Sequence, residues 1–183
     1  IMSDFADSEK AHVWLDGDAF RAPVGTAMPT DPFAATLTGW DAYGGIEAGI
    51  EVTTEQQVTK KKIWNKRNAV YKIIRDALES GMKYRAVDNS KATLLTRLQG
   101  GKITKKGDLY VVELGPGEEF AFFCRFDDGV SKTAFYCPRV TLPSPAKRAA
   151  LDGQNLDGWE FDTSFLEGFE EILPELPAGI TVP

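Results

Sequence analysis

Alternating apolar and polar positions in the second half of the chain predict a series of antiparallel strands. The predicted strands cover residues 108–114, 118–126, 132–142 and 159–164. Clusters of turn-forming residues at 115–117, 127–129 and 143–145 follow the first, second and third of these strands, as turns would. In the strand at 118–126 both alternating sets of side chains are largely apolar. That strand is therefore expected to lie centrally in a sheet, covered on both faces.

The segment 67–80 fits two kinds of secondary structure. The stretch before it, residues 46–59, is predicted to be extended because β-branched side chains are frequent there. Within 67–80, apolar residues have the spacing of an amphipathic helix ending at Gly81, and they are Val70, Ile73, Ile74, Ala77 and Leu78. β-branched and aromatic side chains also crowd this segment, as in a strand. Periodicity alone therefore does not decide whether residues 67–80 form a helix or a strand.

One helix is predicted with clear start and stop signals, at about residues 90–99. Asp88 or Asn89 is expected to cap its free amides, and Gly100 to supply the left-handed end. Its apolar stripe consists of Leu94, Leu95 and Leu98. The helix should pack on the sheets through this stripe.

The predicted organisation is an N-terminal segment (1–10), one domain (11–165) and a C-terminal arm (166–183). Two short strands at 12–15 and 19–24 are expected around a turn at Asp16-Gly17-Asp18. A long irregular loop follows within residues 25–50, and loops of this length are usually functional or disordered.

The C-terminal arm is more apolar than a solvated tail. It follows a predicted helical turn at 149–154 and the strand at 159–164. Its apolar residues, set among three prolines, are Phe169, Ile172, Leu173, Leu176 and Ile180. We expect the arm to be extended and to dock on a neighbouring subunit.

Length and composition agree with a single folded domain. The 183 residues are 43% hydrophobic and 11% aromatic, enough apolar surface to offset the entropy of ordering the chain. The net charge of −6 favours solubility and argues against general affinity for phosphate backbones. No apolar run approaches the roughly 18 residues of a membrane span, and the first residues have no signal-peptide pattern. Synthesis in the cytosol is expected.

The two cysteines, Cys124 and Cys137, flank the turn at 127–129. A hairpin would bring the two cysteines close together. One of the possible strand registers would place them directly opposite each other. In a cytosolic protein, two small buried hydrophobic residues are favoured over a disulfide.

Catalytic, cofactor and metal sites are not predicted. His12 is the single histidine, and it accompanies no nucleophile motif. Asp16 and Asp18 lack further oxygen ligands at calcium-loop spacing, so a turn is favoured there. The Gly44-Gly45 and Gly100-Gly101 pairs lack the context of a phosphate-binding loop and predict turns.

Charge is distributed unevenly along the chain. Seven basic residues and no acid occur between positions 60 and 75: Lys60, Lys61, Lys62, Lys66, Arg67, Lys72 and Arg75. Eight acidic residues and no base follow Arg148. Complementary patches of this kind suit a self-associating subunit. The alternatives are two solvated surfaces, or nucleic-acid binding through the basic run, which lacks interleaved aromatic residues.

Several short motifs resemble the major tail tube protein of long-tailed bacteriophages, particularly those of actinobacterial hosts. The motifs are Ala22-Pro23-x-Gly25-Thr26-x-x-Pro29-Thr30, Gly39-Trp40 with Gly44, Ile63-Trp64-Asn65, and Asp88-Asn89 before the Leu-bearing helix. In that family the segment after the Trp-Asn pair is a strand that turns back through a hairpin into a second one. The resemblance therefore favours a strand at 67–80, a turn near Ser80-Gly81 and a second strand at 82–87.

The resemblance implies a mainly β fold with one α-helix, an antiparallel β-sandwich of which six subunits close an inner β-barrel ring. Stacked rings would form the tail tube, whose acidic lumen lets the viral genome slide through without specific binding. Implied partners are further copies of the chain and the tape measure, tail terminator and distal tail proteins. Such a protein lies in the virion tail, after assembly in the host cytoplasm, and is not an enzyme.

A subunit interface is expected at nine residues, chosen from the glycine-rich loop, the basic run and the C-terminal arm. They are Trp40, Tyr43, Gly44, Lys60, Lys61, Lys62, Phe169, Ile172 and Leu173. Alternatives are another tube protein, of the type VI secretion or contractile-tail kind, and a monomeric β-sandwich that binds carbohydrate by stacking on Trp40, Tyr43 and Trp159.

Overall fold

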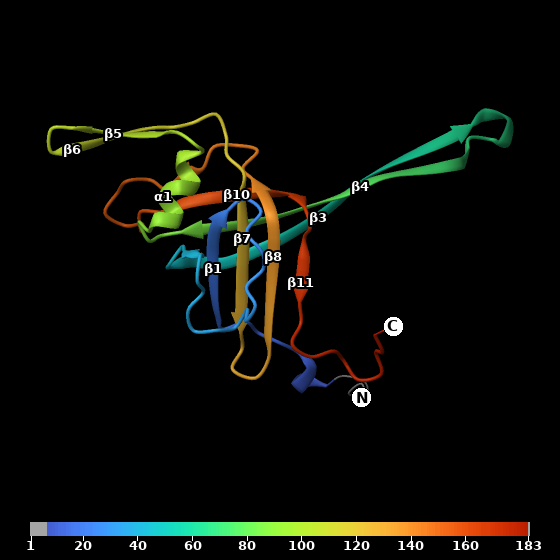
Figure 1. Ribbon diagram of the computed structural model, residues 1–183. Coiled ribbons are helices and arrows are strands. Elements are labelled where there is room, and N and C mark those ends of the chain that lie inside the picture. The colour runs from blue at the N-terminus through green and yellow to red at the C-terminus, as the bar shows by residue number, and fades with distance from the viewer. Residues whose placement is uncertain (1–6, 183) are drawn as a thin grey trace.

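The computed structural model describes residues 7–182 and is mainly β, with a single α-helix in that part of the chain (Figure 1). The elements are η1 (Ser8–Lys10), β1 (Asp16–Pro23), β2 (Asp41–Ala42), β3 (Ile46–Ile63), η2 (Trp64–Lys66), β4 (Ala69–Ala86), α1 (Lys91–Leu98), β5 (Lys102–Lys106), β6 (Leu109–Glu113), β7 (Phe120–Asp127), β8 (Lys132–Thr141), β9 (Lys147–Arg148), β10 (Trp159–Glu167) and β11 (Glu170–Ile172).

The strands form an antiparallel sheet in the order β2-β1-β7-β8-β10-β4-β3, which folds over itself at β10. The first part of β10 pairs with β4, and its end pairs with β8 across an irregularity between Phe165 and Glu167. After Gly168, β11 continues along β8. The result is consistent with a β-sandwich, in which β1, β7 and β8 face β4 and β10.

Aromatic side chains fill the space between the two layers. Tyr84 of β4 and Phe122 of β7 have ring centroids 5.2 Å apart, and Phe161 of β10 lies 5.4 Å from Tyr84. The opposite face of β7 is covered by the irregular loop before β2, where Trp40 lies 5.9 Å from Phe123. Residues 120–124 are therefore buried on both faces, as the sequence predicts for a central strand.

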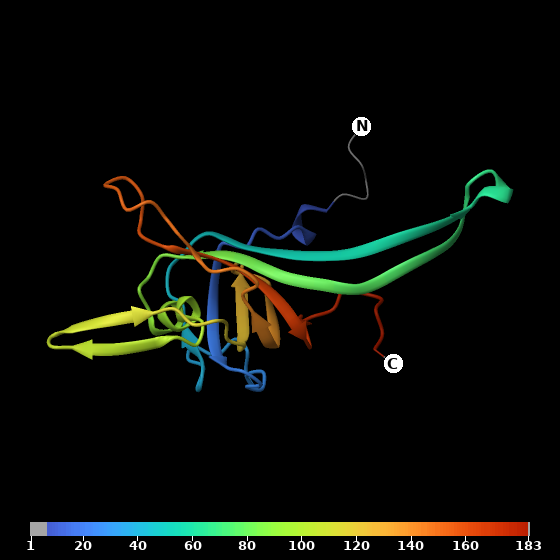
Figure 2. The same ribbon diagram turned by 90° about the horizontal axis from the view of Figure 1, so that it is seen from above.

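Two hairpins project from the body in opposite directions (Figures 1 and 2). The longer one, which we call the arm, comprises residues 51–79 of β3 and β4 and ends at η2. Its turn is made by Arg67 and Asn68 in left-handed conformations, with φ of 51° and 59°. The shorter one is the pair β5–β6, which forms a separate two-stranded sheet.

In the segment 67–80, Arg67 and Asn68 form the hairpin turn and residues 69–80 are a strand and not a helix, but the predicted turn at Ser80-Gly81 is wrong. β4 continues through Gly81, and the hairpin turn instead follows Ile63. A Cβ atom at Gly81 would overlap the backbone carbonyl of Thr163 in β10. The glycine is thus explained by close contact between strands, which the sequence pattern cannot distinguish from a turn.

The N-terminal strand prediction needs a similar correction. Asp16, Gly17 and Asp18 lie in β1, paired with Asp127, Phe126 and Arg125 of β7, and residues 12–15 are not a strand. The pairing with β7 satisfies the backbone of this segment, so it forms no turn despite its composition.

Helix α1 forms at the predicted position with a different cap. Its N-cap is Ser90, whose Oγ accepts from the backbone N–H of Thr93 at 3.2 Å. Asp88 instead accepts from the N–H of Gly45 at 2.8 Å and thereby holds the turn at Gly44-Gly45. The left-handed C-cap is Gln99, with Gly100 also at positive φ. The fully buried residues are Ala92, Thr93 and Thr96, whereas Leu94 and Leu95 are half-buried.

The segment 149–154 forms no helix. The carboxylate of Asp152 accepts from the N–H groups of Gln154 and Asn155, at 2.9 and 2.8 Å, and this local turn replaces the helical one.

The two cysteines are free and buried, as expected. They are not directly opposite, because Cys124 pairs with Phe135 and Cys137 with Phe122.

Candidate assembly interface

The arm is almost entirely exposed although it contains many large apolar side chains. Trp64 at its tip is 86% exposed. The others exposed along it are Val52, Val58, Val70, Tyr71, Ile73, Ile74 and Leu78. An isolated two-stranded hairpin is marginally stable in water, and exposed apolar surface of this extent marks an interaction site. The arm is therefore built to be covered by another molecule.

The arm also presents unpaired strand edges. β10 pairs with β4 only from Ser80 onward, so residues 69–79 have β3 as their single neighbour among the described strands. β3 is itself the last strand of the sheet. Unpaired N–H and C=O groups along such edges are templates for pairing with another chain.

The arm also has the positive charge expected from the sequence. Lys60, Lys61 and Lys62 of β3 are exposed near its tip. None of the seven basic residues between positions 60 and 75 forms an ion pair with another residue of the described chain. Their charges remain available for an acidic surface elsewhere.

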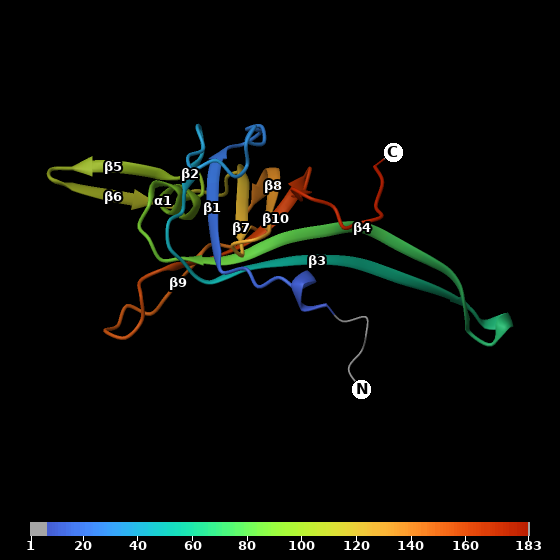
Figure 3. The ribbon, with the colours of Figure 1, turned by 90° about the horizontal axis from the view of Figure 1, so that it is seen from below.

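The shorter hairpin β5–β6 is exposed in the same way (Figure 3). Leu109 and Tyr110 near its turn are 72% and 68% exposed. Sequence analysis did not identify this hairpin or Trp64 as interface residues. One signal could have identified them. Bulky apolar and basic side chains occur together in these strands, and apolar and polar residues do not alternate regularly along them.

The two aromatic residues of the glycine-rich loop are buried in the subunit, although most of the loop backbone around them is exposed. Tyr43 is fully buried, Trp40 is 9% exposed, and Gly44, at φ 82°, lies against Asp88. Tyr43 and Trp40 pack on opposite faces of the sheet. Trp40 and Tyr43 are therefore covered within the subunit, and any part they play at an interface is through the core that they hold together, whereas Gly44 is exposed.

A buried polar network connects this loop to helix α1. The Oη of Tyr43 lies 2.7 Å from Oγ1 of Thr96, which also accepts from Nη1 of Arg21 at 3.1 Å. Nη2 of Arg21 donates to Glu118 at 2.7 Å. Burial raises the pKa of Tyr43 and raises that of Tyr84 well above its ordinary value. Both phenols stay neutral, and their role is structural.

The C-terminal segment binds first to its own subunit. Phe169 stacks on Phe135 at 5.9 Å and Ile172 pairs with Ala134 of β8, so both are half-buried against their own subunit and only part of each remains for a neighbour. Leu173 is different: it is 48% exposed, beyond the last pairing of β11. The expected docking arm is thus reduced to residues 173–182.

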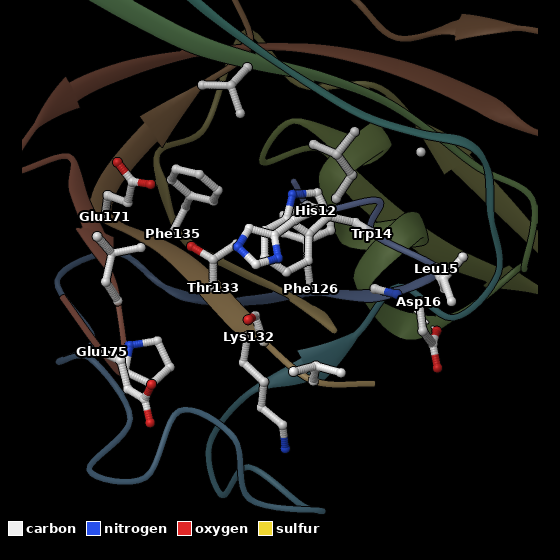
Figure 4. A pocket seen from close by; sticks show the side chains of 18 of the residues that line it. His12, Trp14, Leu15, Asp16, Phe126, Lys132, Thr133, Phe135, Glu171 and Glu175 are labelled. Carbon is white, nitrogen blue, oxygen red and sulfur yellow. Dashed lines mark hydrogen bonds between the residues drawn. The ribbon is translucent and has the colours of Figure 1, made fainter. Parts of the chain in front are cut away.

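An open groove of about 930 Å³ lies between the start of β3, the ends of β7 and β8, and the segment after β11. Its apolar centre is formed by Trp14, Phe126 and Phe135. Figure 4 shows Glu171 and Glu175 on one side of this centre and Asp16 on the other. We call this surface the acidic groove.

The acidic groove has few charges of its own to neutralise these acids. Lys132 is the one lysine or arginine among its described lining residues, and it already lies 3.5 Å from Asp127. Glu171 and Glu175 form no ion pair with a described residue. The groove therefore combines an apolar centre with unneutralised carboxylates.

One rim of the groove is held by an N-terminal contact. His12 Nδ1 lies 2.8 Å from Asp128, and the His12 ring stacks on Trp14 at 5.4 Å. The N–H groups of Ser131 and Val130, and then His12, lower the pKa of the Asp128 carboxyl. This histidine is thus structural.

Among residues 7–182, no three His, Cys, Asp or Glu side chains gather in a way that could hold a metal ion. The same part of the chain contains no helix long and apolar enough to cross a membrane.

Comparison with known proteins identifies the family. No curated protein matches the chain. A family model described as phage tail tube protein matches residues 6–147, which is most of the chain. That match includes both projecting hairpins and the central strand β7. The chain therefore belongs to a family of phage tail tube proteins.

Proposed function

We propose that the protein is the repeating subunit of a hollow phage tail tube, in which six copies close a ring and successive rings stack. The viral genome would pass through the lumen into the host. The observation that carries the proposal is the arm, a long exposed hairpin whose apolar side chains and outer strand edges have no partner among residues 7–182 of the subunit. A monomeric protein would gain nothing from exposing it.

Ring closure would remove the exposed edge of the sheet. β3 is the last strand on one side and β2, of two residues, covers only a part of β1 on the other. Joining such edges between subunits satisfies backbone groups that would otherwise be open to further pairing. A closed symmetric ring is the usual way in which identical subunits achieve this.

The charge of the chain supports passage of DNA without binding. The net charge of −6 has the sign that repels a phosphate backbone, while the basic residues of the arm are available for protein contacts. The other proposed partners are the tape measure, tail terminator and distal tail proteins, and the proposed location is the virion tail, after assembly in the host cytoplasm.

The carbohydrate-binding alternative loses its support. Its stacking residues Trp40 and Tyr43 are buried, and Trp159 is covered by Arg97 and Arg148, whose guanidinium carbons lie 4.8 and 5.3 Å from its ring. The other alternative, a tube of the contractile-tail or type VI secretion kind, shares the assembly mode and differs in the surrounding particle.

Light scattering and negative-stain microscopy of the purified chain test the proposal. We expect a species of six times the 20.1 kDa subunit mass, together with hollow tubes at higher concentration. A single 20.1 kDa species at every concentration, and its absence from the tails of the parent particle, would refute it.

A further inference from the structure

The tip of the arm and the acidic groove are complementary surfaces, and each lacks a partner in the described part of its own subunit. We infer that the acidic groove receives the tip of the arm of a second copy of this chain. Trp64 fills its apolar centre, and the arm's lysines face Glu171 and Glu175. The inference rests on the proposed function and adds which segment of one subunit contacts which surface of the next.

Trp64 is the feature of the tip that most needs a partner. It is 86% exposed in the short turn η2, where no other described segment of its own subunit covers it. Tryptophan side chains in apolar pockets are the residues on which interface affinity most often depends. The groove offers aromatic surface from Trp14, Phe126 and Phe135, and its volume of about 930 Å³ exceeds what one side chain occupies.

Charge favours the tip of the arm over the hairpin β5–β6 as the segment that enters the acidic groove. The tip region between positions 60 and 75 has seven bases and no acid. In β5–β6 the three lysines, at 102, 105 and 106, are largely offset by Asp108 and Glu113. The groove has Asp16, Glu171 and Glu175 around its centre. Complementary potentials favour the correct encounter and fix the register.

The arm cannot reach the groove of its own subunit. Val52 lies in the groove wall, and β3 and β4 extend from the body in a gently curved hairpin that ends at η2, far from it (Figures 1 and 2). About a dozen residues of extended strand span roughly 40 Å. The contact must therefore be made between two copies.

Such a contact joins two different surfaces, a tip and a groove. Each subunit inserts its tip into one neighbour and receives the tip of another in its groove. When successive copies are displaced along an axis, such a contact forms an open stack and not a closed dimer. This arrangement suits contacts between successive rings and gives the stack a direction.

Disulfide trapping between two variants tests the contact. One protein contains Asn65→Cys, next to Trp64, and the other contains Leu173→Cys, at the groove. The native Cys124 and Cys137 are buried, so they should not contribute. We expect a disulfide-linked dimer when the two are mixed under oxidising assembly conditions, and none from either protein alone. A third protein, Leu109→Cys, replaces the first to test the hairpin β5–β6.

The outcomes separate this inference from the proposed function. The inference is overturned if tubes form without a disulfide between positions 65 and 173, or with a disulfide between positions 109 and 173 in its place. Either result leaves the tube function standing. A 65–173 dimer without rings or tubes supports the contact and counts against the tube. Neither bond and no assembly would overturn both.

A second variant checks the role of the tryptophan. Trp64→Ala should raise the concentration needed for tube formation by about tenfold or more, the usual effect of truncating a central interface aromatic. Its unfolding midpoint as a subunit should not change, because the side chain is exposed. Assembly at the wild-type concentration would contradict the inference.

Discussion

The hydroxyl of Tyr43 lies 2.7 Å from Oγ1 of Thr96, and this contact ties the glycine-rich loop to helix α1 inside the core. Because Thr96 donates its own proton to the carbonyl of Ala92, Tyr43 is the donor to Thr96. The same oxygen accepts from Arg21. One threonine therefore satisfies two buried donors.

Replacing Thr96 by valine should destabilise the subunit by about 1–3 kcal/mol, because two buried donors lose their acceptor while the shape is kept. Urea unfolding measures the change. Thr104→Val, on the exposed strand β5, is the matched control and should change stability by less than about 0.5 kcal/mol. Equal effects of the two variants would contradict the role assigned to the network.

Gly81→Ala should destabilise the contact between β4 and β10. The added Cβ overlaps the carbonyl of Thr163, and a backbone atom cannot move aside without disturbing the strand pairing. Forced overlap of this kind costs about 1–3 kcal/mol. Gly153→Ala is the control, since nothing lies within 4 Å of its Cβ position. A Gly81→Ala protein as stable as the control would show that the strands are not so close.

Reversing the charges at Lys60, Lys61 and Lys62 to glutamate should impair stacking and leave subunit stability within about 0.5 kcal/mol of wild type. These side chains are exposed and form no ion pair in the described subunit. Sedimentation of assembled tubes measures the effect. Glutamine at the same positions should give a smaller loss, and 1 M salt should weaken wild-type stacking by screening. Unchanged assembly by the glutamate variant would refute the role of the basic tip.

Subunit stability should fall as pH rises above about 9. Burial raises the pKa of Cys124, Tyr43 and Tyr84, so the folded state holds protons that the unfolded chain releases at alkaline pH. Their contributions are complete below the unfolded pKa values and decline above them, by up to about 1.4 kcal/mol per pH unit and group.

Urea unfolding between pH 8 and 11 checks this slope. Cys124→Ala should make the dependence of the unfolding free energy on pH less steep between pH 9 and 10. The variant lacks the buried thiol whose proton the unfolded chain releases there. The same slope in the variant would show that Cys124 does not contribute.

The sequence predicted best the elements whose side chains are buried on a regular period. The central strand β7 and the strands β8 and β10 have apolar residues at their covered positions, whereas α1 was located by its start and stop signals and buries Ala92, Thr93 and Thr96 more fully than Leu94 and Leu95. The strands of the arm were harder to predict. Both faces of the arm are exposed in one subunit, so burial does not require apolar and polar residues to alternate. Val70, Ile73 and Ile74 could therefore have the spacing of a helix while lying in a strand.

Contacts between distant segments account for the remaining errors. Gly81 was interpreted as a turn because its neighbour across the sheet, Thr163, is far away in sequence. The burial of Trp40 and Tyr43 likewise depends on strands far away in sequence, and their expected part in an interface stays a prediction. The basic run was placed correctly on an exposed surface, whereas of the hairpin β5–β6 only the second strand was predicted, within residues 108–114.

Cryo-electron microscopy of the assembled chain, at a resolution that separates strands, tests the central claim most directly. The account predicts a hollow tube in which the arm of every subunit, residues 51–79, is covered by neighbouring copies. A particle in which the arm stays exposed to solvent, or a protein that remains a monomer under all assembly conditions, would contradict it.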